Sequence, residues 1–319
     1  MRIAEIALSA IIAFAVVYVI YQNDRGNSVL LSSTSNNYTV AINSVPKAMA
    51  DSLLAIPVTI TGERNEKIKF LFRYALPKMR DIEHLYRYGA TPLTVVDSSA
   101  GLYQANVRIG AKGTLSYYYI EIRDPVGRNI AGLKNTDGQP LTTLAIGQVD
   151  SWVKYGYYIC LFIAALLVTM GAFGSIRIIA GKAEAESAGK IFLLAALFTI
   201  VAVFVLGNLY RLQLIAGGWQ GTPWGINVSD NLKQILVIYL IFISLAFRIV
   251  KTKSSKMQTI FPKAALEYMG IVSFFVMITA LILPLFVGKD YENIPVIFYA
   301  FLALLVISYF LVLRRTKHA

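Results

Sequence analysis

Six apolar blocks, each close to the ~20 residues that an α-helix needs to cross a bilayer, constrain this chain more than any other feature of its sequence. Because the backbone finds no water inside lipid, blocks of this kind cross a membrane as helices that pair their own N–H and C=O groups. The blocks therefore predict six transmembrane helices, at about 3–21, 152–176, 191–210, 234–250, 268–287 and 294–313.

Composition agrees with this prediction and excludes several kinds of chemistry. The chain is 56% hydrophobic and 15% charged, whereas soluble domains are about 45–50% apolar and about 25% charged. A single cysteine, Cys160, allows no disulfide or thiolate metal site within the chain. Histidine occurs only at His84 and His318. We therefore expect no cofactor and no metal site.

The basic residues between the blocks predict the orientation of the helices, because Lys and Arg in short loops stay on the cytoplasmic side. They fall on one side if both termini are cytoplasmic, which leaves residues 22–150 outside the cytoplasm. We expect this protein in a prokaryotic inner (plasma) membrane, and we attribute most of its net charge of +12 to topology rather than to a nucleic-acid partner. These basic residues are Arg2, Arg177, Lys182, Lys190, Arg248, Lys251, Lys253, Lys256, Lys263, Arg314, Arg315 and Lys317.

The long polar stretch after the first block predicts a separate domain. Residues 1–21 are interpreted as an uncleaved anchor helix and 22–55 as a tether, with a lone edge strand as the alternative for about 22–46. Residues 56–150 hold short β-branched and aromatic runs between turn residues. In residues 115–123, Tyr118, Ile120 and Ile122 alternate with polar neighbours, as in a strand with one buried face. The predicted fold is an α-helical polytopic membrane protein of six transmembrane helices, with an extracytoplasmic all-β sandwich inserted between the first helix and a five-helix domain at 151–319.

Part of this domain resembles a known class of module. The stretch from residue 85 to 127 is similar to the immunoglobulin-like or fibronectin-type-III-like modules of bacterial envelope proteins. The resemblance implies a β-sandwich for about 56–150 and carries no ligand or activity with it. The matching motifs are Tyr86-Arg87-Tyr88-Gly89, Gly101-Leu102-Tyr103-Gln104-Ala105, Gly113, and the run from Tyr118 to Gly127.

The central parts of the six predicted spans hold no ionisable residue. Because ion pathways, proton relays and catalytic dyads in membranes need such residues, ion-coupled transport and intramembrane proteolysis are not expected. No metal-binding, nucleotide-binding or nucleophile-elbow motif occurs either. Asp124 and Asp137 are interpreted as turn residues, with a calcium site at the end of the sandwich as the alternative.

Two groups of residues are candidates for interaction. The first is a Gly-rich loop that holds Trp219, Trp224, Asn227 and Asp230; the tryptophans suit either an interfacial aromatic belt or an anchor for a partner. The second is the outward face of the strand at 115–123, with Tyr117, Tyr119 and Arg123.

Together these features predict a non-catalytic integral membrane subunit, scaffold or assembly factor of an envelope complex. Its expected partners are the lipid bilayer and other membrane-protein subunits. Three alternatives remain open: a facilitator or channel for a neutral or lipidic substrate, an extracytoplasmic ligand sensor, and an enzyme at the outer interface that would use Asp230, Asp290 or Glu292.

Overall fold

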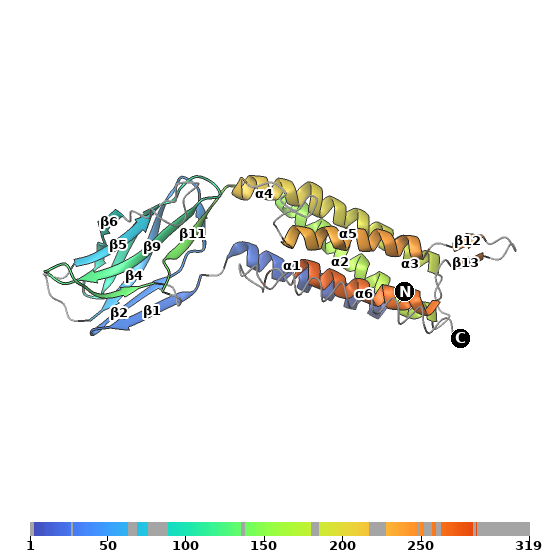
Figure 1. The fold of residues 1–319 in the computed structure, drawn as a ribbon, viewed down its shortest axis with the longest axis horizontal. Helices are drawn as coiled ribbons and strands as arrows, with labels where there is room; N and C mark the ends of the chain where they lie inside the picture. The colour runs from blue at the N-terminus through green and yellow to red at the C-terminus, as the bar shows by residue number, and fades with distance from the viewer. Residues whose placement is uncertain are drawn as a thin grey trace. The chain divides into compact units, whose positions relative to one another are not determined.

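The computed structural model describes residues 3–26, 28–62, 69–75, 89–134, 138–179, 185–216, 228–247, 249–251, 257–259, 263–282 and 285. The chain divides into two units, which are described separately below (Figure 1). The helical unit comprises Met1–Asp24, Asp150–Tyr210 and Gly218–Ala319, and the β-unit comprises Arg25–Val149 and Arg211–Gly217.

Among the described residues of the helical unit, helices α2, α3, α5 and α6 pack against one another in a ring. Helix α2 packs on α3 and α6, and α5 packs on the same two helices from the other side. Helix α1 adds a buried stripe of Ser9, Ala13, Val16 and Ile20, spaced three or four residues apart as expected for one helix face. The helices are α1 (Ile3–Arg25), α2 (Ser151–Ile179), α3 (Ala185–Ile200), the π-helix η1 (Val201–Leu206), α4 (Gly207–Ile215), α5 (Val228–Ala246) and α6 (Lys263–Leu281).

The prediction of six transmembrane helices with a single inserted all-β sandwich is wrong. Among the described residues, three helices are long and apolar enough to cross a membrane, namely Ile3–Arg25, Ser151–Ile178 and Glu186–Ile215. Helices α5 and α6 contain shorter apolar stretches. The difference arises because apolar composition does not by itself determine backbone conformation: the end of the fourth predicted span enters strand β12 (Ile249–Lys251), which pairs with β13 (Met257–Thr259). The sixth predicted span, 294–313, lies outside the described residues.

The β-unit contains two sheets whose facing sides share one apolar core. The first sheet has the order β1-β2-β4-β8-β7, and the second has the order β3-β11-β9-β5-β6, with β10 paired to β9. Among the described strands of the β-unit, the pairings are antiparallel except that of β11 with β3, which is parallel. The strands are β1 (Leu30–Ser35), β2 (Tyr38–Asn43), β3 (Lys47–Met49), β4 (Leu53–Thr61), β5 (Lys69–Ala75), β6 (Gly89–Pro92), β7 (Thr94–Asp97), β8 (Leu102–Arg108), β9 (Leu115–Arg123), β10 (Asn129–Leu133) and β11 (Leu141–Ile146).

Alternating apolar residues explain which strand faces are buried. Tyr118, Ile120 and Ile122 of β9 are fully buried, which confirms the alternation predicted there. Residues 22–55, predicted as a tether or a lone edge strand, contain the end of α1, strands β1 to β3 and the start of β4. In β2, Val40 and Ile42 are also buried in the shared core. The short apolar alternation of β2 is flanked by Ser and Asn, which concealed the strand in the sequence.

Tyr118 places a hydroxyl group in the core between the sheets. Its hydroxyl lies 3.5 Å from that of Thr143, and the Thr143 hydroxyl donates to the carbonyl of Val45. Removal from water raises the pKa of Tyr118 above its ordinary value of 10.0, although hydrogen bonding partly opposes the rise. The folded β-unit therefore keeps this proton at a pH where the unfolded chain has begun to lose it.

We expect Tyr118→Phe to change how stability depends on alkaline pH. A raised pKa in the folded state contributes stability that is fully present below the unfolded pKa of 10.0 and is lost as the pH rises above it. Thermal unfolding of both proteins in detergent, followed by the circular dichroism of the sheets, should show a difference that is constant at neutral pH and shrinks above about pH 10. Parallel profiles across this range would contradict the role assigned to Tyr118.

The end of α4 is capped within the β-unit. The last carbonyl groups of a helix have no partner within the helix. The Lys112 ammonium group donates to the carbonyl of Leu212 at 3.0 Å, and the Gly147 N–H group donates to that of Leu214 at 2.7 Å. Gly113 has a φ of +85°, and a Cβ atom there would overlap the carbonyl group of Ile215. The loop around Gly113 is thus shaped to accept the helix end.

Substitution of Gly113 by alanine should be more costly than the same change at Gly127. Both residues have positive φ, but a Cβ atom at Gly127 meets no other atom within 4 Å. Gly127→Ala should cost about 1–2 kcal/mol through its backbone conformation alone, and Gly113→Ala about 1–3 kcal/mol more through the overlap. Thermal unfolding of the two variants measures the difference, and equal losses would show that the overlap relaxes freely.

Candidate functional site

The first group of predicted interaction residues is mostly beyond what the structure describes. Trp219, Trp224 and Asn227 lie outside the described residues, and Asp230 is described only by its place in the first turn of α5. The interaction role of this loop therefore stays a prediction.

The second group lies together on the face of β9 that points away from the core. Tyr117 and Tyr119 are half-buried, and the Arg123 side chain is 31% exposed. Glu121 lies between them on the same face, but its side chain is only 9% exposed. Nε and Nη2 of Arg123 each lie 3.0 Å from Oε2 of Glu121. This ion pair fixes the direction of the arginine, since the buried carboxylate needs a cationic partner.

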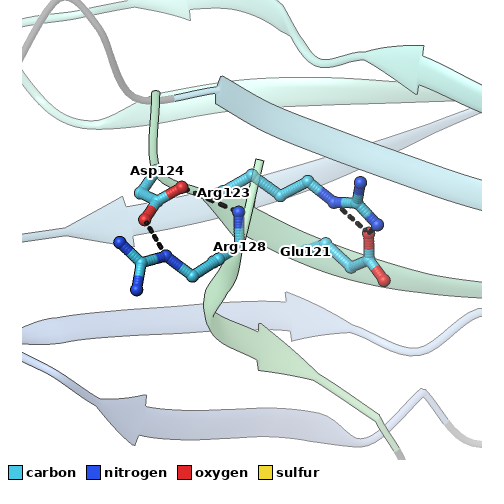
Figure 2. A network of polar contacts seen from close by, with 4 residues as sticks. All are labelled: Glu121, Arg123, Asp124 and Arg128. Carbon is cyan, nitrogen blue, oxygen red and sulfur yellow. Dashed lines mark hydrogen bonds and ion pairs between the residues drawn. The ribbon is translucent and has the colours of Figure 1, made fainter. Parts of the chain in front are cut away.

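A second ion pair closes the turn between β9 and β10. The Arg128 backbone N–H group donates to Oδ1 of Asp124 at 2.7 Å, and Nε of Arg128 lies 3.2 Å from Oδ2 (Figure 2). Both carboxylate oxygens of Asp124 thus have partners within the turn. This arrangement supports the interpretation of Asp124 as a turn residue rather than a calcium ligand; Asp137 lies outside the described residues.

Further basic residues gather around the same strand. The Lys134 ammonium group lies 5.3 Å from the ring centre of Tyr119, within cation–π range. In the pairing of β5 with β9, Arg73 is opposite Tyr119 and Lys69 is opposite Arg123. We call this surface the β9 strip and define it by Tyr117, Tyr119, Glu121, Arg123, Asp124, Arg128 and Lys134.

A polar cluster in the helical unit was not predicted from the sequence. The Tyr158 hydroxyl of α2 donates to Oδ2 of Asp24 in α1 at 2.6 Å, and lies 3.5 Å from the Tyr210 hydroxyl of α4. Tyr157, Tyr158 and Tyr210 are each only 7–8% exposed. We call this group the tyrosine–aspartate cluster and define it by Tyr21, Asp24, Tyr157, Tyr158 and Tyr210.

Ring contacts hold the cluster together. Tyr157 and Tyr210 stack with their centres 5.4 Å apart, and Tyr21 meets Tyr158 edge to face at 5.5 Å. Tyr210 comes soon after the π-helix η1, which is a rare element often found at functional sites. Gly207, directly after η1, lets Tyr157 approach, because a Cβ atom there would lie 3.3 Å from its ring.

Helix α1 is tied to α2 at its other end as well. Glu5 and Arg177 form an ion pair of 3.4 Å, with both side chains less than a third exposed. The start of α1 therefore lies beside the end of α2, while its last turns contact the start of α2. The two helices run antiparallel, joined by polar contacts at both ends.

No protein-family model matches the chain, and no curated protein is significantly similar to it. Among the described residues, no three His, Cys, Asp or Glu side chains are grouped so that they could hold a metal ion. The β9 strip and the tyrosine–aspartate cluster are therefore the features of this chain from which a function can be inferred.

Sequence reasoning missed the cluster for a specific reason. Its residues lie at the ends of three separate predicted spans, where tyrosine is common at membrane interfaces anyway. The one available signal was Asp24, an acidic residue placed within one helical turn of Tyr21. Nothing local indicated that Tyr158 or Tyr210 would meet it.

Tyr158→Phe should destabilise the helical unit by about 1.5–3 kcal/mol, because it removes a hydrogen bond between a buried hydroxyl group and the half-buried carboxylate of Asp24. Tyr155→Phe is the matched control, since Tyr155 belongs to the same helix and is 60% exposed. Its effect should stay within about 0.5 kcal/mol. Thermal unfolding in detergent, followed by helical circular dichroism, distinguishes the two. Equal effects would mean that the bond to Asp24 contributes nothing specific.

Proposed function

We propose that this chain is a non-catalytic integral membrane subunit, scaffold or assembly factor of an envelope complex. In this proposal the helical unit resides in the lipid bilayer and the β-unit carries contacts with other membrane-protein subunits. Both termini are placed in the cytoplasm and the β-unit outside it, in an inner (plasma) membrane. The distribution of Lys and Arg supports this orientation.

The outward sides of the helices support the bilayer as one partner. Large apolar side chains are more than half exposed there, including Ile11, Phe14, Ile159, Ile238 and Phe275. A soluble protein rarely exposes apolar surface of this extent. In lipid the same side chains face acyl chains, and the three long apolar helices provide the required length.

We also propose that the β-unit is immunoglobulin-like. Immunoglobulin constant-type domains place strands A, B, E and D in one sheet and C, F and G in the other. The orders β2-β4-β8-β7 and β11-β9-β5 match A-B-E-D and G-F-C when the strands are taken in chain order. This supports a domain class that often serves in contacts between proteins, but it assigns no ligand.

The observation that carries the subunit proposal is the β9 strip. Tyrosine and arginine are enriched at protein interfaces and among the residues that dominate binding energy. Here Tyr117, Tyr119 and Arg123 share one outward strand face, and the ion pair with Glu121 holds the arginine in place. A side chain that is already ordered loses less entropy when a partner binds.

The proposal is tested by purifying the intact protein in mild detergent and identifying what accompanies it by mass spectrometry. We expect a membrane partner in stoichiometric amount. Tyr119→Ala should lower its recovery about tenfold at unchanged abundance of the protein. Gln104→Ala, on the outward side of the other sheet, is the control and should leave recovery unchanged. Purification of the chain alone would contradict the proposal.

The Trp-containing loop is tested in the same way. Alanine at Trp219 and Trp224 should weaken recovery of the partner without lowering the abundance of the protein, because tryptophan is a preferred anchor at interfaces. If abundance falls as much as recovery, the loop serves the stability of the protein itself.

A further inference from the structure

We propose that the β9 strip is a docking surface for a carboxylate-rich segment of a partner subunit. This inference rests on the proposed function and specifies the chemistry of the partner. The inference is argued from the solvent exposure of the acidic and basic side chains of the strip.

Both acidic side chains of the strip contact arginines of the strip itself. Glu121 is 9% exposed and contacts two nitrogens of Arg123. Asp124 is 20% exposed, and its two oxygens contact the backbone and side chain of Arg128. Each carboxylate thus has an arginine partner, Arg123 for Glu121 and Arg128 for Asp124 (Figure 2), which offsets its negative charge.

The basic side chains are presented at the surface. The side chain of Arg128 is 79% exposed, and Lys134 is exposed beside the ring of Tyr119. The strip thus carries three basic side chains, Arg123, Arg128 and Lys134, against two paired carboxylates, and its net positive charge complements an acidic partner.

The shape of the basic groups suits oxyanions, carboxylates among them. A guanidinium group has five N–H donors in a planar fork that matches a carboxylate, and only two nitrogens of Arg123 contact Glu121. Because the ion pairs orient both arginines, the forks are positioned before binding.

An apolar residue beside these cations favours a protein over a polyanionic glycan or phosphate polymer. Val126, in the turn between β9 and β10, is 77% exposed. Along the chain, Val126 lies between Arg123 and Arg128. A peptide that carries both acidic and apolar side chains can use this residue together with Tyr117 and Tyr119, whereas a purely anionic polymer gains little from it.

The test measures binding of a fluorescein-labelled deca-glutamate peptide to the intact protein in nanodiscs of neutral lipid, by fluorescence anisotropy at low salt. We expect Lys134→Glu to weaken binding about tenfold or more and Tyr119→Leu severalfold. Arg108→Glu is the matched control, because it reverses one charge at an exposed position on the other sheet. It should change affinity by no more than about twofold.

Lys134→Gln provides a milder variant in case charge reversal disturbs folding, which circular dichroism of the sheets would reveal; it should weaken binding in the same direction. Equal losses for Lys134→Glu and Arg108→Glu would overturn the inference, since net charge alone would then explain binding. Tighter binding of inorganic polyphosphate of matched charge would overturn the assignment of carboxylate as the ligand.

Failure of this inference can be distinguished from failure of the proposed function. The peptide measurement needs no cellular partner, whereas the purification experiment needs no assumption about charge. A recovered partner together with equal losses in the peptide assay would leave the subunit proposal standing and overturn the acidic docking surface. Specific peptide binding by a chain that purifies alone would support the surface and contradict the subunit proposal.

Discussion

A helix leaves the carbonyl groups of its last turn without partners inside the helix, and the chain supplies these and other polar groups near helix ends with partners from distant segments. The final carbonyl groups of α4 receive bonds from Lys112 and Gly147. At the end of α1, Asp24 accepts a hydrogen bond from Tyr158. Each of these contacts joins segments far apart in the chain and so connects elements that the sequence separates.

Ion pairs within the β-unit likewise supply partners for its carboxylates. Its two carboxylates on the β9 strip contact arginines of the same strand and the following turn, which leaves basic and aromatic groups facing outward. A buried carboxylate would be costly alone, and its arginine partner offsets that cost while becoming fixed in direction. The same ion pairs therefore stabilise the carboxylates and orient the arginines for a binding partner.

Predictions from the sequence were correct where the spacing of apolar residues along one strand determines which side chains are buried. They were incorrect where burial depends on residues elsewhere in the chain. Tyr118, Ile120 and Ile122 were correctly placed on one buried face, because alternation of period two is a property of the strand itself. Glu121 was expected to be an outward polar residue; it is on that face, yet almost covered, since Arg123 lies against it. The six-helix prediction was wrong, in part because apolar composition extended beyond the helix in residues 249–251. Strands β1 to β3 were not located in the sequence, because Ser- and Asn-rich flanks concealed them.

The sequence by itself determined that the chain has helices able to cross a membrane and a region of alternating strands, since both follow from the spacing of apolar residues. Only the tertiary structure decided which polar side chains meet. Asp24 and Tyr158 are 134 residues apart, and Tyr158 and Tyr210 are 52 apart. No local periodicity relates such positions. Their contact depends on how α1, α2 and α4 pack, which is why the tyrosine–aspartate cluster emerged only from the fold.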